Sequence, residues 1–229
     1  MPESTITPAA SSIAARFAGL QQAVATAHTR FRLSTTSPTL IAVSKRQPEE
    51  RVRAALEAGQ RVFGENKVQE AQARWKKLKQ NHPGITLHLI GPLQRNKVKE
   101  AVTLFDTIHT VDREKLVDAL AKEMERQSRL LPCFLQINTG EESQKSGVAP
   151  QDVEKLLTYA RERGLNIVGL MCIPPADEPP APHFALLGRL AERYGLTQLS
   201  MGMSSDFEDA IRFGATHIRI GTALFGTRE

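Results

Sequence analysis

Lys45 is the residue of this chain best placed to do covalent chemistry. It follows the apolar run Leu40-Ile41-Ala42-Val43-Ser44, and a Glu-rich helical pattern begins just after it at Pro48. Such a run predicts a buried strand, and desolvation at the carboxyl end of a strand favours the neutral, nucleophilic form of a lysine amine. The commoner alternative is a lysine in a solvated loop, so the rest of the chain has to decide.

Two later segments have the composition of an anion site. Residues 200–206 read SMGMSSD, and residues 219–226 read RIGTALFG. Small residues let backbone N–H groups approach an anion, and the start of a helix adds a partial positive charge. Ser204, Gly221 and Thr222 are therefore candidates to hold a phosphate. The alternative is that the serines only cap a helix and the glycines only turn the chain.

A lysine together with a phosphate site indicates two chemistries. One is a Schiff-base aldolase that binds a phosphorylated sugar, and the other is a site for pyridoxal 5′-phosphate (PLP), whose aldehyde condenses with the lysine. Arg219 favours the second, because it precedes Gly221 by two residues and so shares its face of the strand. An arginine facing the ring nitrogen of PLP would keep that nitrogen unprotonated and weaken the electron sink. An arginine at the rim of a barrel is the open alternative.

Strand-like and helical segments alternate along the chain and define the frame for these residues. Strands are predicted at 40–45, 61–65, 85–90, 107–111, 132–137, 166–172, 198–202 and 216–220. Helices are predicted at 9–33, 48–58, 67–80, 93–103, 113–129, 151–163, 181–194 and 205–213. This alternation predicts an α/β fold, a (β/α)8 TIM barrel over residues 1–229 as a single domain, with an extra N-terminal helix. A doubly wound open sheet is less favoured because no GxGxxG or P-loop motif is present.

The loops at the two ends of the predicted strands differ in kind. The loops that follow the strands are small, polar and rich in glycine, whereas loops on the other side, such as Glu57-Ala58-Gly59 and Glu162-Arg163-Gly164, have the composition of ordinary helix stops. Barrels of this class carry their sites on the loops after the strands. Lys45 and the two anion-binding segments are therefore expected on one face.

Composition argues against nucleic-acid binding, a metal site and a membrane protein. Lys and Arg number 30 against 25 Asp and Glu, and aromatic residues make up 5%. The basic clusters at 75–79 and 95–99 fall in helical patterns with no interleaved aromatics, so nucleic-acid binding is a minor alternative. Cys133 and Cys172 lie far apart without metal-ligand spacing, which predicts free thiols and no metal. The sequence shows no leader and no membrane span, and we expect a cytoplasmic protein.

Several blocks, taken in order, resemble a known family. They are AVSK (42–45), FGENKVQE (63–70), HLIGPLQRNK (88–97), GLM (169–171), LSMGMS (199–204) and IRIGTALFG (218–226). Together they resemble the pyridoxal phosphate homeostasis proteins, which are similar to the barrel domain of alanine racemase (fold type III). The resemblance covers nearly the whole chain after about residue 38.

The resemblance implies a set of residues that bind PLP. They are Lys45, Asn66, His88, Met171, Ser204, Arg219, Gly221 and Thr222. Lys45 would form the internal aldimine, Arg219 would face the pyridine nitrogen and Asn66 would lie near the ring. Ser204, Gly221 and Thr222 would hold the phosphate. His88 and Met171 would lie in the barrel interior near the cofactor.

Three features depart from the family pattern. Lys67 stands where a tyrosine is frequent and Arg95 where a serine is frequent, and the loop at 138–147 is somewhat longer. None of them falls on a lysine or phosphate position, so PLP remains the expected cofactor.

The residues offer no obvious second base, and the resemblance implies a carrier rather than an enzyme. A racemase needs a second base on the far side of the PLP plane, but Tyr159 and Tyr194 fall in helical patterns away from the site, and Cys172 and His88 are expected in the core. The sequence ends at Glu229, soon after the last strand, and we expect no second domain. The resemblance implies a role in PLP (vitamin B6) homeostasis. A barrel with one open face and no second domain suits transfer of PLP to apo PLP-dependent enzymes, and we expect a monomer because no exposed apolar stripe stands out in the sequence. A weak PLP-dependent racemase is the alternative.

Overall fold

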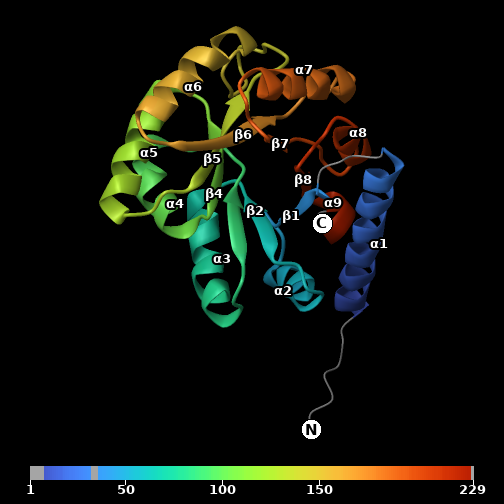
Figure 1. The fold of residues 1–229 in the computed structure, drawn as a ribbon. Coiled ribbons are helices and arrows are strands. Elements are labelled where there is room, and N and C mark those ends of the chain that lie inside the picture. Colours follow the sequence, from blue (N-terminus) through green and yellow to red (C-terminus); the bar gives the residue numbers. More distant parts are fainter. Residues whose placement is uncertain (1–7, 32–35, 228–229) are drawn as a thin grey trace.

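The computed structural model describes residues 8–31 and 36–227, in which strands and helices alternate (Figure 1). The strands are β1 (Thr39–Val43), β2 (Val62–Glu65), β3 (Thr86–Leu89), β4 (Thr107–Val111), β5 (Pro132–Ile137), β6 (Asn166–Cys172), β7 (Gln198–Ser200) and β8 (His217–Ile220). The helices are α1 (Pro8–Arg30), α2 (Glu49–Glu57), α3 (Val68–Asn81), α4 (Val98–Leu104), α5 (Glu114–Gln127), α6 (Val153–Glu162), α7 (Pro180–Arg193), α8 (Phe207–Arg212) and α9 (Thr222–Phe225). Short 3₁₀ turns, η1 (Arg95–Lys97) and η2 (Pro150–Asp152), lead into α4 and α6.

The strands form a closed barrel in sequence order, and β8 pairs with β1 to close it. The pairing is parallel, with Leu40 opposite Ile218 and Ala42 opposite Ile220 at the closure. Because all strands run the same way, their carboxyl ends meet at one mouth of the barrel. The predicted (β/α)8 fold is confirmed.

Apolar side chains fill the layer between the barrel and its helices. The aromatic pair Phe63 and Trp75 illustrates it, because the rings lie 4.7 Å apart and both side chains are fully buried. The barrel interior is tighter: a methyl group on Gly64 would lie 2.8 Å from Ile41 and 3.0 Å from Ile90. The glycine therefore leaves room for the larger side chains of the neighbouring strands.

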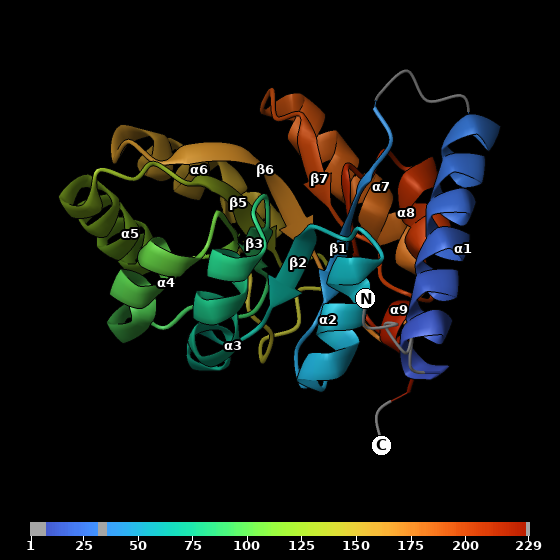
Figure 2. The ribbon, with the colours of Figure 1, turned by 90° about the horizontal axis from the view of Figure 1, so that it is seen from below.

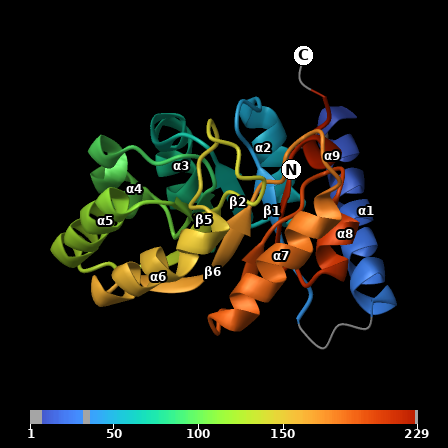
Figure 3. The same cartoon turned by 90° about the horizontal axis from the view of Figure 1, so that it is seen from above.

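Helix α1 precedes the first strand and is additional to the helices that follow the strands of the barrel. It packs against α2, α8 and α9, so that the first described helix covers the last one (Figures 2 and 3). This is the extra N-terminal helix that the sequence predicts, although it ends at Arg30 rather than 33, and residues 32–33 of the prediction lie outside the described residues. The predicted absence of a leader likewise falls largely on residues 1–7, outside the described part.

Element boundaries differ from the predictions at functionally relevant places. β1 ends at Val43, so Lys45 lies in the loop that follows and not in the strand. β7 ends at Ser200, which makes the segment from Met201 to Asp206 a loop. The predicted helix stops are confirmed, because Gly59 and Gly164 have φ of 98° and 79°, the left-handed region that glycine adopts without strain.

Both cysteines are free and buried in the described structure, as predicted. Burial raises the pKa of Cys133 and of Cys172 to about 12, so both remain thiols at neutral pH. Within the described ranges, no helix is long and apolar enough to cross a membrane. The same residues contain no group of three or more His, Cys, Asp or Glu that could hold a metal ion.

Candidate functional site

A pocket of about 610 Å³ opens at the mouth where the carboxyl ends of the strands meet. It is lined by Val43, Lys45, Asn66, Ile90, Ile173, Met203, Ser204, Ser205, Arg219, Gly221, Thr222 and Ala223. The structure thus brings six of the predicted site residues into one cavity: Lys45, Asn66, Ser204, Arg219, Gly221 and Thr222. His88 and Met171 are buried in the barrel and do not line it.

Lys45 is carried on a tight turn directly after β1. The Gln47 N–H donates to the carbonyl of Ser44 at 3.1 Å, which closes the turn around Lys45 and Arg46. Arg46 has φ of 57° in this turn, a left-handed conformation that residues other than glycine rarely adopt. The turn directs Lys45 to the pocket across from the β7 and β8 loops.

Ser204 lies at the centre of a group of converging donors. Its Oγ accepts hydrogen bonds from the backbone N–H groups of Gly221 and Ala223, each at 3.3 Å. It does not cap α8, because that helix starts after Asp206, whose carboxylate accepts the N–H of Met203 at 2.5 Å. Backbone donors that converge on one oxygen form the kind of concavity that also binds phosphate oxygens.

Gly221 leaves space on the pocket side of this group. Its φ of −111° is open to any residue, and a methyl group there would lie no closer than 3.6 Å to Val43. Neither backbone strain nor protein packing therefore requires glycine at this position. A side chain would instead occupy the pocket, which fits a bound group that approaches the backbone closely.

Arg219 projects from β8 and lines the pocket although it is only 5% exposed. Its Nη1 donates to Ser200 Oγ at 2.8 Å and its Nη2 donates to the carbonyl of Cys172 at 2.8 Å. Burial lowers the pKa of the guanidinium, yet an arginine stays protonated in proteins. The site therefore contains a fixed positive charge whose two hydrogen-bond acceptors are neutral.

A chain of buried hydrogen bonds continues from Arg219 into the barrel. His109 Nδ1 lies 2.9 Å from Ser200 Oγ, and His109 Nε2 lies 2.8 Å from Nδ1 of His88. Arg219 can only donate to Ser200, whose hydroxyl can either donate to His109 or accept from it, so the tautomers of the two histidines set the direction of the other two hydrogen bonds. His88 thus connects to the pocket through two intermediates and does not line it.

His88, His109 and the neighbouring His217 are held neutral. Burial, followed by the neighbouring His217, lowers the pKa of His88 to about 3, and burial together with His88, His217 and Arg219 holds that of His109 well below 6.5. His217 lies beside them, with ring centres 5.9 Å from His88 and 5.8 Å from His109. Burial and then Arg219 lower its pKa to about 4.

Sequence reasoning missed His109, Ser200 and His217 as part of this arrangement. A signal was present, because each is a polar residue next to apolar residues of a strand: IHTV at 108–111, LSM at 199–201 and HIRI at 217–220. A polar residue in such a run has to find a partner when it is buried. The sequence does not show which strands supply those partners.

Asn66 provides a further test of whether a polar ligand fits the pocket. Its side-chain Oδ1 is buried, and no hydrogen-bond partner for it is found among the described residues. Buried polar atoms are rarely left without a partner in proteins. A lysine, an arginine, converging backbone donors and an unsatisfied amide oxygen together suit a small, polar and anionic ligand such as PLP.

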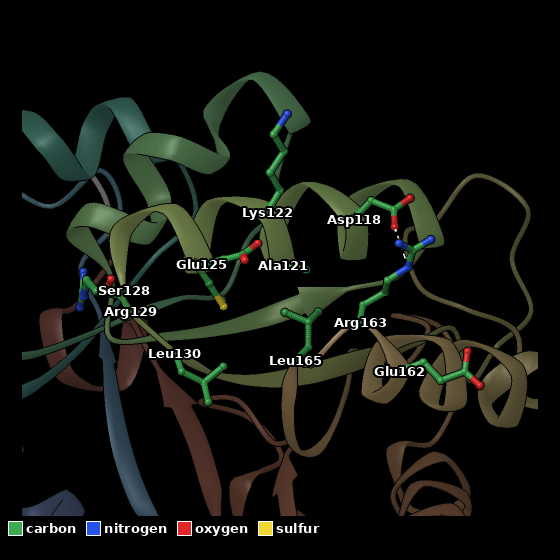
Figure 4. A pocket seen from close by; sticks show the side chains of 12 residues that line it. Asp118, Ala121, Lys122, Glu125, Ser128, Arg129, Leu130, Glu162, Arg163 and Leu165 are labelled. Carbon is green, nitrogen blue, oxygen red and sulfur yellow. Dashed lines mark ion pairs between the residues drawn. The ribbon is translucent and has the colours of Figure 1, made fainter.

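A larger hollow of about 950 Å³ lies elsewhere, between α5, the end of α6 and the loops that precede β5 and β6 (Figure 4). It is at the opposite end of the strands from Lys45. Asp118 and Arg163 in its wall pair with each other at 3.3 Å, and Tyr159 donates to Asp118 at 2.8 Å. This pairing, and the absence of the predicted site residues from its lining, exclude it as the site in question.

Comparisons of the sequence with known proteins also indicate a PLP-related family. A family model described as alanine racemase, N-terminal domain, matches residues 21–229. The pyridoxal phosphate homeostasis protein of Vibrio cholerae is 41% identical over 205 residues, which cover 85% of this chain and 87% of that protein. Its counterpart from Escherichia coli K12 is 35% identical over 227 residues, covering 95% and 97%.

Solved structures with a similar fold include one from the same family and one alanine racemase. PipY of Synechococcus elongatus with PLP bound is 37% identical, with a TM-score of 0.80 over 93% of this chain and 100% of that one. An alanine racemase from Bartonella henselae with covalently bound PLP is 15% identical, with a TM-score of 0.73 over 96% of this chain and 61% of that one. The second likeness concerns the fold alone.

Proposed function

The chain belongs to the alanine racemase N-terminal-domain family, among the pyridoxal phosphate homeostasis proteins, and from this membership we propose that it binds PLP and serves PLP (vitamin B6) homeostasis without catalysing a dedicated reaction. The PLP-bound structure of PipY, at 37% identity, supports the cofactor. The contents of the pocket support the role.

Lys45 holds PLP covalently in this proposal. Its amine condenses with the aldehyde of the cofactor to an aldimine, with loss of water. Ser204, Gly221 and Thr222 take the phosphate, supported by the backbone N–H groups of residues 221 and 223 that converge on Ser204 Oγ. Asn66 lies near the ring, and its unsatisfied amide oxygen supports a polar contact there.

Arg219 faces the ring nitrogen in this arrangement. A protonated guanidinium beside the nitrogen disfavours its protonation and so weakens the electron sink that carbanion chemistry requires. His88 and Met171 lie below the cofactor in the barrel interior, and His88 acts only through the chain of hydrogen bonds that ends at Arg219.

The observation that argues against a dedicated reaction is the set of titratable groups in the pocket. Among the described residues that line it, Lys45 and Arg219 are the ones with titratable side chains. Lys45 is occupied by the aldimine and Arg219 cannot accept a proton at neutral pH, so a second base for proton transfer at a substrate carbon is lacking. Tyr159, which donates to Asp118, lies at the opposite end of the barrel.

Transfer of PLP to apo-enzymes is the second part of the proposal. The pocket opens at the barrel mouth, where the apolar side chain of Ile173 is 40% exposed. An open mouth lets the cofactor leave towards an acceptor. We further propose that the whole chain acts as a single domain and as a monomer in the cytoplasm.

The test is the absorption spectrum of the purified protein with PLP, before and after borohydride. We expect a yellow aldimine band that borohydride bleaches, which Lys45→Ala abolishes and which Lys155→Ala, at an exposed position on α6, retains. A wild-type protein that stays colourless with PLP would refute the cofactor role. Amino-acid racemisation that disappears in Lys45→Ala would favour the alternative of a weak racemase.

A further inference from the structure

Glu65 is a buried carboxylate immediately behind the loop of Lys45. It lies at the end of β2 and is 1% exposed, and its Oε1 accepts three hydrogen bonds. They come from Ser44 Oγ at 2.7 Å, Trp75 Nε1 at 2.9 Å and Arg74 Nη1 at 3.1 Å. A carboxylate buried to this degree is stable only when it is paired and hydrogen-bonded, so these partners hold one another in a fixed geometry.

Arg74 extends this cluster to the turn itself. Its Nη1 also donates to the carbonyl of Ser44 at 2.7 Å, and its Nη2 donates to the carbonyl of Gln47 at 2.5 Å. The two carbonyls stand on either side of Lys45 and Arg46. One guanidinium therefore holds both ends of the turn that carries the lysine, while its own position is set by Glu65.

The turn needs such support because of its backbone. Arg46, in its middle, has φ of 57°, and a left-handed conformation is unfavourable in a residue other than glycine. The closing bond from the Gln47 N–H to Ser44 is the backbone bond within the turn, at 3.1 Å. The contacts from Glu65 and Arg74 offset this cost.

We propose that Glu65 and Arg74 are positioning residues for Lys45. They fix the turn so that Nζ lies where it can attack the aldehyde carbon of PLP, the C–N bond forming as the aldehyde oxygen leaves as water. Neither residue lines the pocket. The inference rests on the proposed binding of PLP through Lys45 and adds to it the source of the lysine's geometry.

A phosphate ligand that cannot form the covalent bond separates positioning from general stability. Pyridoxine 5′-phosphate has an alcohol where PLP has the aldehyde. Its binding therefore depends on the phosphate and ring contacts but not on a covalent bond to Lys45. For Arg74→Met we expect the aldimine band to form at least about tenfold more slowly than in the wild type, because small misplacements of a reacting group cost rate steeply. Its affinity for pyridoxine 5′-phosphate should stay within about twofold of the wild-type value.

Arg129→Met is the matched control. Like Arg74, Arg129 donates to backbone carbonyls, among them those of Thr103 at 2.7 Å and Phe105 at 3.2 Å. These carbonyls are at the end of α4, and Arg129 lies at the other end of the barrel. This variant should lose stability as Arg74→Met does, yet form the aldimine at the wild-type rate. Arg74→Lys keeps the charge but cannot span both carbonyls, and we expect an intermediate rate.

The outcomes discriminate between the two proposals. The positioning role is overturned if Arg74→Met forms the aldimine band as fast as Arg129→Met. It is also overturned if Arg74→Met loses affinity for PLP and for pyridoxine 5′-phosphate to the same extent. If Arg74→Met does not fold, Glu65→Gln, which keeps the shape and removes the charge, takes the same test with the same criteria. The proposed function fails separately, if the wild type itself forms no band that depends on Lys45.

Discussion

Acidification from pH 7 to pH 5 should destabilise this barrel, because its interior contains histidines that stay neutral at pH 5 only when the protein is folded. Burial is the main cause of the lowered pKa of His88, at about 3, and of His217, at about 4. The same cause places the pKa of His109 well below its usual value. An unfolded histidine titrates near pKa 6.5.

The sign and size of the effect follow from these values. Between the folded and unfolded pKa the unfolded chain binds more protons, so the free energy of unfolding falls as the pH drops below about 6.5. At pH 5, which lies above both folded values, the loss depends on the unfolded pKa alone and is about 2 kcal/mol per histidine. His88 and His217 together account for about 4 kcal/mol, a large part of the stability of an ordinary domain, and His109 acts in the same direction.

Urea unfolding at pH 7, 6 and 5, followed by the fluorescence of the single, buried Trp75, measures this loss. His217→Gln should reduce the difference between pH 7 and pH 5 by about 2 kcal/mol, because one titrating group is removed. His82→Gln, at the end of α3 and outside the barrel interior, should leave the difference unchanged. An unfolding free energy that is equal at pH 7 and pH 5 would refute the reasoning.

Two further predictions concern glycines that make room for backbone. A methyl group on Gly169 would lie 2.0 Å from the carbonyl oxygen of Gln198, so Gly169→Ala should lower the free energy of unfolding, measured in urea, by about 3 kcal/mol or more. A methyl group on Gly188 in α7 would meet nothing closer than 3.9 Å. Gly188→Ala should therefore raise the free energy of unfolding by about 0.5–1 kcal/mol. A methyl group on Gly91 would lie 2.3 Å from the backbone oxygen of Asn66, so Gly91→Ala should displace Asn66 and weaken PLP binding by about tenfold in a fluorescence titration. Unchanged PLP affinity in that variant would contradict a role for Asn66 near the ring.

The parts of the site that follow from sequence are those at strand ends. Lys45, Ser204 and Gly221 follow apolar runs, and a parallel barrel places everything after its strands at one mouth. The prediction therefore needed only the alternation of strands and helices. The boundaries of individual elements, such as the end of β1 at Val43, were not needed for it.

The parts that do not follow from sequence depend on lateral contacts between strands. The partnership of His109 with Ser200 joins residues 91 positions apart on strands that are not neighbours in the barrel. That of Glu65 with Arg74 depends on how the first turns of α3 pack beneath the loop after β1. Periodicity predicts that such residues are buried, but which acceptor each donor finds depends on the closed geometry of the barrel.

The interior of this barrel explains why a fold shared with racemases can serve as a carrier. Arg219 is fixed by two neutral acceptors, and the chain behind it ends in histidines whose low pKa keeps them neutral at physiological pH. Such a chain orients a positive charge but does not exchange protons with a ligand at pH 7. If Arg219 faces the ring nitrogen as proposed, its positive charge, held in place by these hydrogen bonds, keeps the nitrogen of PLP unprotonated and weakens the electron sink. Proton transfer at a substrate carbon would also require a second base, and among the described residues that line the pocket only Lys45 and Arg219 have titratable side chains. The interior and the pocket therefore favour the same function: binding PLP rather than using it for turnover.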